Sequence, residues 1–268
     1  MKLDKQYIEN IRLFLFDMDG TLYLGNRLYD FTKELLATIK NQNRRYLFMT
    51  NNSSKSVADY IKKLEQLGIA ATREDFITSS QATAYYLHKH HEGQKLYVCG
   101  TNSLKEELGR EGFTVTETAD EAECIVMGFD TELTFQKLED VSRLLLTREI
   151  PYIATNPDLV CPTEFGSVPD CGSVCQMIEN ATGKRPIVIG KPAPLMPQLA
   201  MERLGYSKEE TCVVGDRIYT DIKSGLHADI TTILVMSGET TREILKASPE
   251  KPHIVLEDAG EILDVLKA

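Results

Sequence analysis

The sequence predicts an α/β fold whose core is a doubly wound, mainly parallel sheet, with a second α/β domain inserted into it. Short apolar runs alternate with longer segments of helical spacing, the rhythm of parallel strands joined by crossover helices. Three of these runs end abruptly in polar loops, as buried strands do where their carboxyl ends meet a site. In open α/β sheets such endings could converge on one crevice.

The three apolar runs cover residues 11–16, 46–49 and 212–214. Asp17 follows the first run, Thr50 the second, and Gly215 and Asp216 the third. Between them, residues 57–67 and 197–204 have helical apolar spacing, and each segment is followed by a glycine, where a helix would stop. We expect these two segments to be crossover helices.

The segment 81–184 contains a second series of strands and helices that could bury a core of its own. The expected strands are 96–99, 124–127 and 152–154, and the expected helices are 103–110 and 135–148. This segment carries 17 acidic and 8 basic residues, whereas the rest of the chain carries 23 and 22. Because nearly all the net charge lies there, we expect an inserted domain at 81–184 and a core made of 1–80 and 185–268.

Composition excludes several classes of protein. The 268 residues have a formal net charge of −10 and a pI near 5.1, which argues against a nucleic-acid partner. The first ten residues carry four charged side chains, so they are not the apolar core of a signal peptide. No apolar run approaches the roughly 18 residues of a membrane span. We therefore expect a cytoplasmic protein that binds neither nucleic acid nor membrane.

The six cysteines form no Cys-x-x-Cys pair, so reduced and partly buried thiols are expected. Cys171 and Cys175 are spaced for one helix face. A zinc site at this pair would need ligands from elsewhere, because no nearby histidine completes a tetrahedral set.

Asp17 and Asp19 are candidates for acid–base and nucleophilic chemistry. They are two residues apart, so in extended backbone both carboxylates point to the same side, and Gly20 then permits a tight turn. One carboxylate could attack phosphorus and form an aspartyl phosphate, while the other handles protons. The alternative is a plain turn or a calcium loop, but the EF-hand pattern fails because Gly20 follows Asp19 at once.

Four segments together resemble a known family. They are Asp17-Met-Asp-Gly-Thr-Leu-Tyr, Thr50-Asn-Asn-Ser-Ser, Gly190-Lys-Pro and Gly215-Asp-Arg-Ile-Tyr-Thr-Asp. They resemble, in the correct order, the four motifs of haloacid dehalogenase superfamily phosphatases, and are most similar to the NagD-like, p-nitrophenyl phosphatase-like branch, subfamily IIA. The resemblance spans nearly the whole chain. It implies a Rossmann-like core and a magnesium-dependent phosphomonoester hydrolase that works through an aspartyl phosphate.

The resemblance implies a role for each motif residue. Asp17 is the nucleophile, and Asp19 is the general acid and base. The Thr50 hydroxyl and the backbone N–H groups from Thr50 through Asn51 to Asn52 bind the transferring phosphoryl oxygens. By itself a Thr-Asn-Asn sequence would more often be a turn or a helix cap.

The resemblance also implies a cation site. Lys191 directs its ammonium at the phosphate and at Asp17, although a lone lysine is usually a solvated surface charge. Asp17, the main-chain carbonyl of Asp19 and the carboxylate of Asp216 hold Mg²⁺, a hard cation that takes oxygen ligands. Asp221 holds a metal-bound water or orients Lys191. The alternative for Asp221 is a carboxylate that stabilises the start of a helix.

The insert resembles the cap domain of this branch, which covers the active site and sets substrate choice. Asn156-Pro-Asp158 matches a cap motif, whereas Asp170 departs from the pattern because a glycine is usual there. Four residues in expected strand-end loops are candidates for contact with the leaving group: Asp130, Asn156, Asp158 and Asp170. Each could instead be a plain turn residue.

The expected substrate is a small phosphorylated metabolite of the nucleotide or sugar phosphate type. Two alternatives stay open: a phosphotransferase or phosphomutase, which passes the phosphoryl group to another acceptor, and a non-catalytic phosphate-binding regulatory module. A phosphate loop is absent, because Gly183-Lys184 is followed by Arg185 instead of Ser or Thr. The cap surfaces could also pair two copies of the chain into a homo-oligomer.

Overall fold

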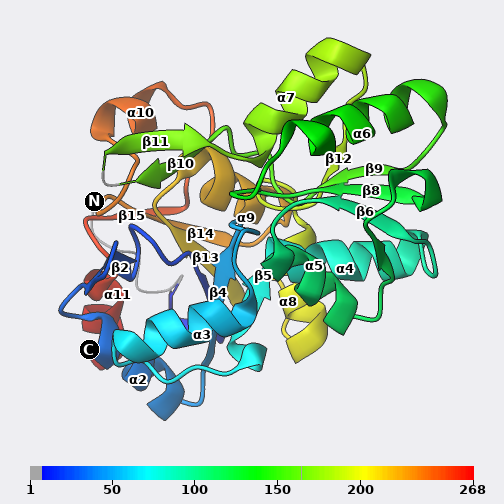
Figure 1. Ribbon diagram of the computed structural model, residues 1–268. Helices are drawn as coiled ribbons and strands as arrows, with labels where there is room; N and C mark the ends of the chain where they lie inside the picture. The colour runs from blue at the N-terminus through cyan, green and yellow to red at the C-terminus, as the bar shows by residue number, and fades with distance from the viewer. Residues whose placement is uncertain (1–7, 164) are drawn as a thin grey trace. The chain divides into compact units, whose positions relative to one another are not determined.

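The computed structural model describes residues 8–163 and 165–268, which divide into two compact units (Figure 1). The first unit takes the chain up to Thr50 and adds Ile61–Ile77 and Lys191–Ala268. The second takes Asn51–Tyr60 and Thr78–Gly190. The expected insert, 81–184, falls inside the second unit, while its exact limits as an independent domain stay a prediction.

The first unit contains a six-stranded sheet in the order β15-β14-β13-β1-β4-β5. The strands are β1 (Leu13–Phe16), β4 (Arg45–Thr50), β5 (Phe76–Thr78), β13 (Thr211–Gly215), β14 (Thr231–Val235) and β15 (Ile254–Leu256). The chain moves from β1 to one edge of the sheet and later returns beside β1 to build towards the other edge. This reversal makes the sheet doubly wound, and it lies between β1 and β13.

Register places the carboxyl ends of three strands side by side. Phe16 at the end of β1 pairs in parallel with Val214 of β13 and with Phe48 of β4. All four residues of β1 are buried, as expected for a parallel strand covered on both faces. The residues that follow these strands, Asp17 and Asp216 among them, therefore leave the sheet at the same edge.

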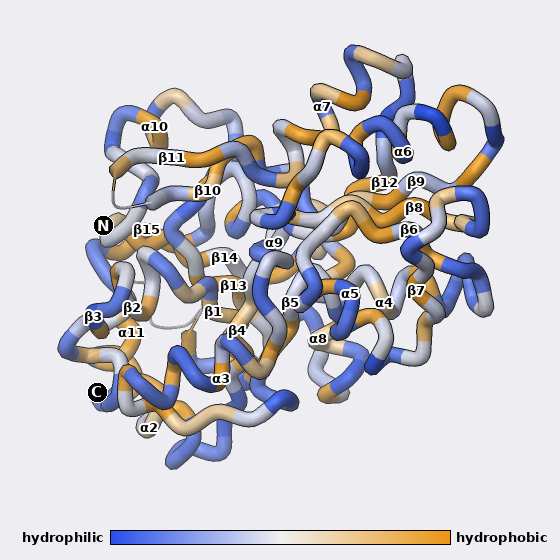
Figure 2. Tube along the Cα trace, viewed as in Figure 1, coloured by the Kyte–Doolittle hydropathy of each residue, from blue (hydrophilic) through white to orange (hydrophobic). Residues whose placement is uncertain are grey.

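Helices surround this sheet, and a short hairpin follows β1. The helices are α2 (Thr32–Asn41), α8 (Leu195–Leu204), α9 (Lys223–His227), α10 (Arg242–Ala247), α11 (Gly260–Lys267) and the part of α3 (Val57–Gln66) that follows Tyr60. The hairpin pairs β2 (Tyr23–Leu24) with β3 (Arg27–Leu28). A π-helical turn, Ile218–Ile222, connects the end of β13 to α9. The apolar strands contrast with the largely polar outer helical turns in Figure 2.

The second unit contains a five-stranded parallel sheet in the order β12-β9-β8-β6-β7. Its strands are β6 (Leu96–Cys99), β7 (Val115–Thr116), β8 (Cys124–Met127), β9 (Tyr152–Ala154) and β12 (Ile187–Val188). Its helices are α4 (Ser79–His90), α5 (Asn102–Arg110), α6 (Phe135–Thr147) and α7 (Cys171–Thr182). Figure 1 shows α6 and α7 on one face of this sheet and α4 and α5 on the other. An antiparallel hairpin, β10 (Val160–Thr163) with β11 (Gly166–Pro169), precedes α7.

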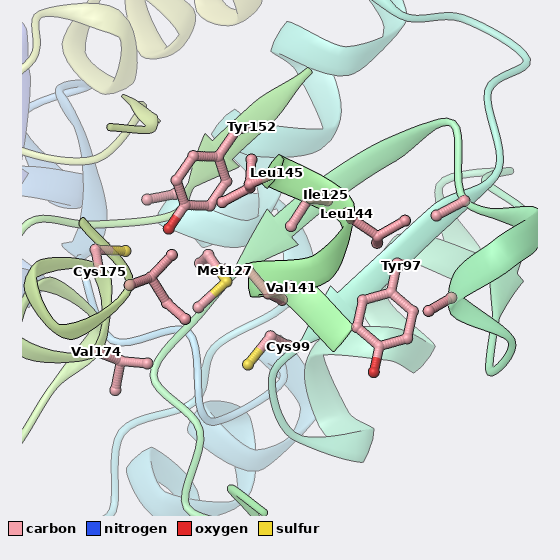
Figure 3. Close-up of a cluster of buried hydrophobic side chains, with 14 of the residues drawn as sticks. Tyr97, Cys99, Ile125, Met127, Val141, Leu144, Leu145, Tyr152, Val174 and Cys175 are labelled. Carbon is pink, nitrogen blue, oxygen red and sulfur yellow. The ribbon is translucent and has the colours of Figure 1, made fainter. Parts of the chain in front are cut away.

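A separate apolar core supports the second unit. Ile125 and Met127 of β8 pack with Val141 and Leu144 of α6, and Cys175 of α7 joins the same cluster (Figure 3). All of these side chains are buried. The second unit therefore contains a buried apolar cluster, and the independence of segment 81–184 as a domain stays a prediction.

The predicted elements agree with the structure to within about two residues. Strands 96–99, 124–127 and 152–154 are found at the predicted bounds, while the strand expected at 11–16 begins at Leu13. Gly68 and Gly205 both adopt positive φ, +77° and +72°, after the helices they were expected to end. Among the described residues, the helices are too short or too polar for any of them to span a bilayer.

Candidate active site

Three carboxylates gather beyond the carboxyl ends of β1 and β13. Asp17 directly follows β1, Asp216 directly follows β13, and Asp221 lies in the π-helical turn. One carboxylate oxygen from each lies within 4.8 Å of the others. The parallel register of β1 and β13 brings these residues together although they are about 200 positions apart in the sequence.

Lys191 joins this cluster and bridges two of its members. Its ammonium Nζ lies 2.6 Å from Asp17 Oδ1 and 2.6 Å from Asp221 Oδ1, and it also donates to the Met49 carbonyl at 3.3 Å. The Lys191 side chain is only 3% exposed. The lysine is therefore a buried ion-pair partner and not the solvated surface charge that was the alternative.

Burial controls the electrostatics of the cluster. Desolvation raises the pKa of Asp17 to about 6, although the ammonium of Lys191 opposes the shift. Burial, together with the charges of Asp17 and Asp221, raises the pKa of Asp216 to about 8. Burial alone would lower the pKa of Lys191, but its two carboxylate partners keep that pKa above its usual value. Three carboxylates therefore share one buried ammonium, and burial and mutual repulsion favour the protonated form of Asp216.

The loop after β14 closes around Asp216. The backbone N–H of Glu239 donates to Asp216 Oδ2 at 2.6 Å, and the N–H of Thr240 donates to the Asp216 carbonyl at 3.2 Å. A Cβ on Gly238 would lie 2.0 Å from Asp216 Oδ2, so only glycine permits this approach. Asp216 Oδ1 is buried and accepts no hydrogen bond from the described residues.

The donor set fits a hard divalent cation. A buried carboxylate oxygen without a donor costs free energy, and a cation beside it removes that cost. Asp17 Oδ and Asp216 Oδ1 offer the oxygen ligands that Mg²⁺ and Ca²⁺ prefer. Both oxygens of Asp221 are engaged, one by Lys191 and the other by the backbone N–H of Arg217 at 3.0 Å.

Asp19 differs from the other acidic residues because its side chain is largely exposed, at 58%. Met18, between the two aspartates, is buried. Asp19 Oδ1 accepts from the N–H of Gly25 at 3.4 Å, and Lys63 Nζ lies 3.9 Å from Asp19 Oδ2. An accessible carboxyl that is loosely held can exchange protons with a substrate or with water.

Thr50 ends β4 and is buried. Because Lys191 donates to the carbonyl of Met49, its ammonium lies beside the strand end that carries Thr50. In the second unit, Asn51 Nδ2 donates to Asp158 Oδ2 at 2.8 Å, and Asn52 Oδ1 accepts from the N–H of Ser54 at 2.9 Å. The expected phosphate contacts of Thr50, Asn51 and Asn52 stay a prediction.

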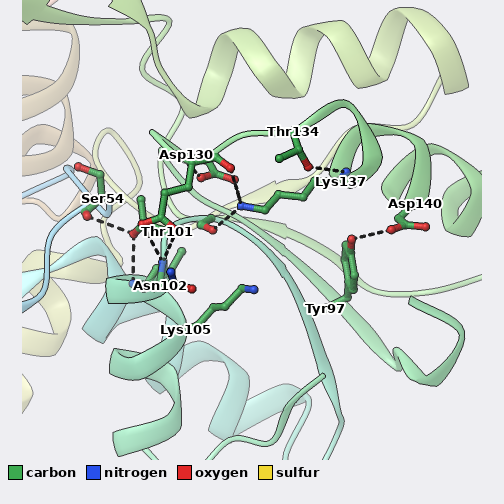
Figure 4. Close-up of polar contacts among 12 residues, drawn as sticks. Ser54, Tyr97, Thr101, Asn102, Lys105, Asp130, Thr134, Lys137 and Asp140 are labelled. Atoms are coloured by element: carbon green, nitrogen blue, oxygen red, sulfur yellow. Dashed lines mark hydrogen bonds and ion pairs between the residues drawn. The ribbon is translucent and has the colours of Figure 1, made fainter. Parts of the chain in front are cut away.

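The four candidates for contact with the leaving group are all buried residues of the second unit. Asp130 Oδ2 accepts from Lys137 Nζ at 2.7 Å, and its Oδ1 accepts from the N–H of Glu132 at 2.8 Å (Figure 4). Asp170 begins α7 and accepts from the N–H of Cys171 at 2.5 Å. These bonds are typical of a loop residue and of a helix N-cap residue. Contact with a leaving group stays a prediction for both aspartates.

Asn156 and Asp158 belong to one hydrogen-bonded group. Asn156 Nδ2 donates to Asp158 Oδ2 at 2.9 Å and to Asp170 Oδ1 at 3.1 Å. Asn156 Oδ1 accepts from the Thr155 hydroxyl at 2.9 Å, so both ends of the amide are bonded within the protein. The structure therefore brings three of the four candidates together, while Asp130 lies in a different contact group.

Comparison with known proteins gives a consistent result. Residues 14–114 match the family model of haloacid dehalogenase-like hydrolases, and residues 188–262 match a related HAD-hydrolase-like model. The acid sugar phosphatase of Staphylococcus saprophyticus is 33% identical over 261 residues, covering 97% of this chain and all of that protein. The 5'-nucleotidase YutF of Bacillus subtilis is 34% identical over 248 residues, covering 92% and 96%.

Solved structures agree. The 4-nitrophenylphosphatase of Thermotoga maritima superposes with a TM-score of 0.92 at 39% identity, covering 98% of each chain. The chain belongs to the haloacid dehalogenase-like hydrolases, in their NagD-like branch. NagD of E. coli K-12 superposes with a TM-score of 0.85 at 30% identity, covering 94% of this chain and 98% of that one. The expected family, the α/β fold and the assignment as a phosphatase are thereby confirmed.

The sequence alone did not identify every residue around the cluster of Asp17, Lys191, Asp216 and Asp221. The loop of Gly238 and Glu239 shapes the surroundings of Asp216, and Arg217 pairs with Glu239 at 2.8 Å. The charges of Glu239 and Asp17 hold the pKa of Arg217 above its usual value, although burial alone would lower it. A signal was present, because the apolar run 233–236 also ends in a polar loop.

Proposed function

We propose that this phosphatase hydrolyses a small phosphorylated metabolite in a magnesium-dependent reaction that passes through an aspartyl phosphate on Asp17. The observation that carries the proposal is the buried cluster in which Lys191 bridges Asp17 and Asp221 beside Asp216, whose Oδ1 accepts no hydrogen bond from the described residues. Such a cluster combines a nucleophile, a fixed ammonium and a carboxylate oxygen that can bind a second cation.

In the first step, an Asp17 carboxylate oxygen attacks phosphorus and the bond from phosphorus to the ester oxygen breaks. Asp19 gives its proton to that oxygen, so the alcohol leaves neutral. In the second step, Asp19 takes a proton from water, the water oxygen attacks phosphorus, and the bond from phosphorus to Asp17 breaks. Inorganic phosphate is released and both aspartates regain their first state. The exposure of Asp19 supports this shuttling role.

Lys191 has two tasks in this scheme. Its bond to Asp17 fixes the orientation of the nucleophile, and its charge stabilises the oxygens of the transferring phosphoryl group. Asp221 holds Lys191 in place through the 2.6 Å contact. The hydroxyl of Thr50, at the neighbouring strand end, would supply a further donor to the phosphoryl oxygens.

Magnesium is the proposed ion. Asp17 and Asp216 would hold it with the main-chain carbonyl of Asp19, and Asp221 would support the site through Lys191. When bound, the cation neutralises charge that develops on the phosphoryl oxygens. The residues contribute carboxylate oxygens and a buried environment, in which each charge interaction is stronger than in water.

Two relatives, which are named as an acid sugar phosphatase and a 5'-nucleotidase, support a proposal for the substrate class. We propose a sugar phosphate or nucleotide, with the segment 81–184 acting as the cap that selects the leaving group. This segment carries a net charge of −9, which repels an anionic substrate, so recognition must come from local polar groups. Pairing of two copies through this segment stays a prediction.

The test is a panel of phosphomonoesters, assayed with Mg²⁺ for release of inorganic phosphate. Phosphate that appears in step with substrate loss supports hydrolysis, whereas substrate loss with retained organic phosphate indicates a phosphotransferase or phosphomutase. Binding without turnover across the panel would favour a regulatory module. Asp17→Asn is the matched control, because the amide keeps the volume of the side chain but removes the nucleophile.

A further inference from the structure

The loop that follows β9 holds both chain segments at the limits of the second unit. One segment begins at Asn51, which is bonded covalently to Thr50, and the other ends at Gly190, which is bonded covalently to Lys191. Thr50 and Lys191 are two of the residues assigned to phosphate binding above. The contacts of this loop therefore reach the immediate chain neighbours of two catalytic side chains.

The segment that begins at Asn51 is held by side chains. Asn51 Nδ2 donates to Asp158 Oδ2 at 2.8 Å. The hydroxyl of Ser53 lies 2.8 Å from the hydroxyl of Thr155, and the N–H of Phe129 donates to Ser53 Oγ at 2.9 Å. All five residues are buried. These bonds fix the segment in a dry environment, where a hydrogen bond has a larger effect on structure than at the surface.

The segment that ends at Gly190 is held by the same loop. The Gly190 N–H donates to the Thr155 carbonyl at 2.8 Å. A Cβ on Gly190 would lie 2.5 Å from that carbonyl oxygen and 2.6 Å from Asn51 Oδ1. The two segments and Thr155 therefore pack so closely that only a residue without a side chain fits at position 190.

The loop is itself held together by buried hydrogen bonds. Asn156 has no exposed surface, and its amide bonds link Thr155, Asp158 and Asp170. Asp170 is the N-cap residue of α7, so the group is attached to a regular element of the second unit. A buried network in which the central amide is bonded at both ends has one preferred geometry. Because the loop also bonds to the segments of Asn51 and Gly190, it fixes the positions of those segments.

We propose that Thr155, Asn156 and Asp158 are positioning residues of the phosphatase reaction, which act through Asn51 and Gly190 on the placement of Thr50 and Lys191. The proposal rests on the proposed function, because it assumes that Thr50 and Lys191 bind the transferring phosphoryl group. A displacement of about 1 Å in such groups can cost about 100-fold in rate. The role differs from contact with the leaving group, since it affects every substrate alike.

The first experiment is a double-mutant cycle on Asn51→Ala and Asp158→Ala. Rates are measured with 4-nitrophenyl phosphate and with a larger phosphomonoester from the panel. We expect each single variant to lose about tenfold in kcat with both substrates. The double variant should lose no more activity than the less active single variant, because the bond between Asn51 and Asp158 is already lost in each. Asp158→Asn keeps an oxygen acceptor, so it should restore most of the activity.

A second pair of variants addresses a different contact of the segment that begins at Asn51, the one made by Ser53. Thr155→Val keeps the shape but removes the hydroxyl that meets Ser53, whereas Thr155→Ser retains the hydroxyl. The matched control is Tyr97→Phe, which removes a bond of 2.9 Å from β6 of the same sheet to Asp140 of α6 without touching either segment (Figure 4). We expect Thr155→Val to lower kcat several-fold, and Thr155→Ser and Tyr97→Phe to leave it unchanged. Unfolding temperatures should fall similarly for Thr155→Val and Tyr97→Phe.

Three results would overturn the proposal: losses confined to the larger substrate, which mean contact with its leaving group; additive losses in the cycle; and normal kcat in the Asp158→Ala and Thr155→Val variants. Failure of the proposed function is separate, because it would appear as phosphate release by Asp17→Asn. If Asp158→Ala fails to fold, Asp158→Asn and the Thr155 pair still decide the question.

Discussion

The two units of this protein end their parallel strands in polar residues, but those residues are satisfied in different ways. In the first unit, buried acids crowd together, the pKa of Asp216 rises to about 8, and Asp216 Oδ1 accepts no hydrogen bond from the described residues. In the second unit, Asn156 is fully buried and its amide is bonded at both ends. Polar residues at the carboxyl ends of parallel strands can therefore either stay available to a ligand or be bonded within the protein.

The difference has an energetic meaning. A buried polar group without a hydrogen-bond partner lowers the free energy of unfolding by about 1–3 kcal/mol. A protein that retains such a group is less stable than one in which the group is bonded. A satisfied network has no such deficit and makes one arrangement specific. We infer that the first cluster is incomplete until a cation and a phosphate bind, whereas the second is complete in the protein alone.

The largest expected effect comes from removing the nucleophile. Asp17→Asn should lower phosphate release by about 1,000-fold or more, because the amide lacks the charge that makes the carboxylate a nucleophile. Wild-type protein with beryllium fluoride and Mg²⁺ should trap an acyl-phosphate mimic at Asp17. Substantial turnover by a correctly folded Asp17→Asn variant would contradict the assignment of Asp17 as the nucleophile, and with it the contrast between the two units.

Removing the buried ammonium of Lys191 should lower both the stability and the activity of the protein. Lys191→Met leaves Asp17 and Asp221 without their shared ammonium, and breaking a buried pair typically costs about 3–5 kcal/mol. Denaturant unfolding at neutral pH measures this loss in the free energy of unfolding. The loss should be smaller at pH 5, where Asp17, with its pKa near 6, is protonated. A neutral effect on stability would show that the pair contributes little.

Metal dependence sharpens the comparison further. Chelation should abolish activity and Mg²⁺ should restore it, whereas Ca²⁺ should substitute poorly because it prefers more ligands at longer distances. Asp216→Ala should raise the Mg²⁺ concentration for half-maximal activity by about 100-fold, or prevent recovery, because it removes one of few protein ligands. Full activity in excess chelator, with no carried-over ion, would contradict the metal role.

The smallest expected effect concerns stability against pH. In the metal-free protein the pKa values of Asp17 and Asp216 are raised to about 6 and 8 from 3.8, so the folded state binds more protons than the unfolded state between pH 4 and 8. Stability should therefore fall as pH rises through this window. Asp216→Asn removes one of these groups and should flatten the fall. Thermal unfolding in chelator at pH 5 and pH 8 measures both slopes, and equal slopes would contradict the assignment.

The local elements could be predicted from sequence because they depend on local patterns. Buried parallel strands require continuous apolar runs, and helix ends require residues such as Gly68 that tolerate positive φ. Asp17, Lys191 and Asp216 could be singled out because the four motifs occur together in order. Their gathering beyond the sheet needed only the general rule that ligands bind at the carboxyl ends of parallel strands.

The tertiary structure decided which polar groups form hydrogen bonds with one another. Glu239 meets Asp216 through its backbone N–H, and Asn51 meets Asp158 across 107 positions of sequence. A hydrogen bond needs a separation of about 3 Å, which depends on strand register and loop path and leaves no trace in residue type. The sequence thus determined that acids and amides lie at the strand ends. Folding alone determined that Asp216 Oδ1 lies without a donor among the described residues, while the amide of Asn156 is fully bonded.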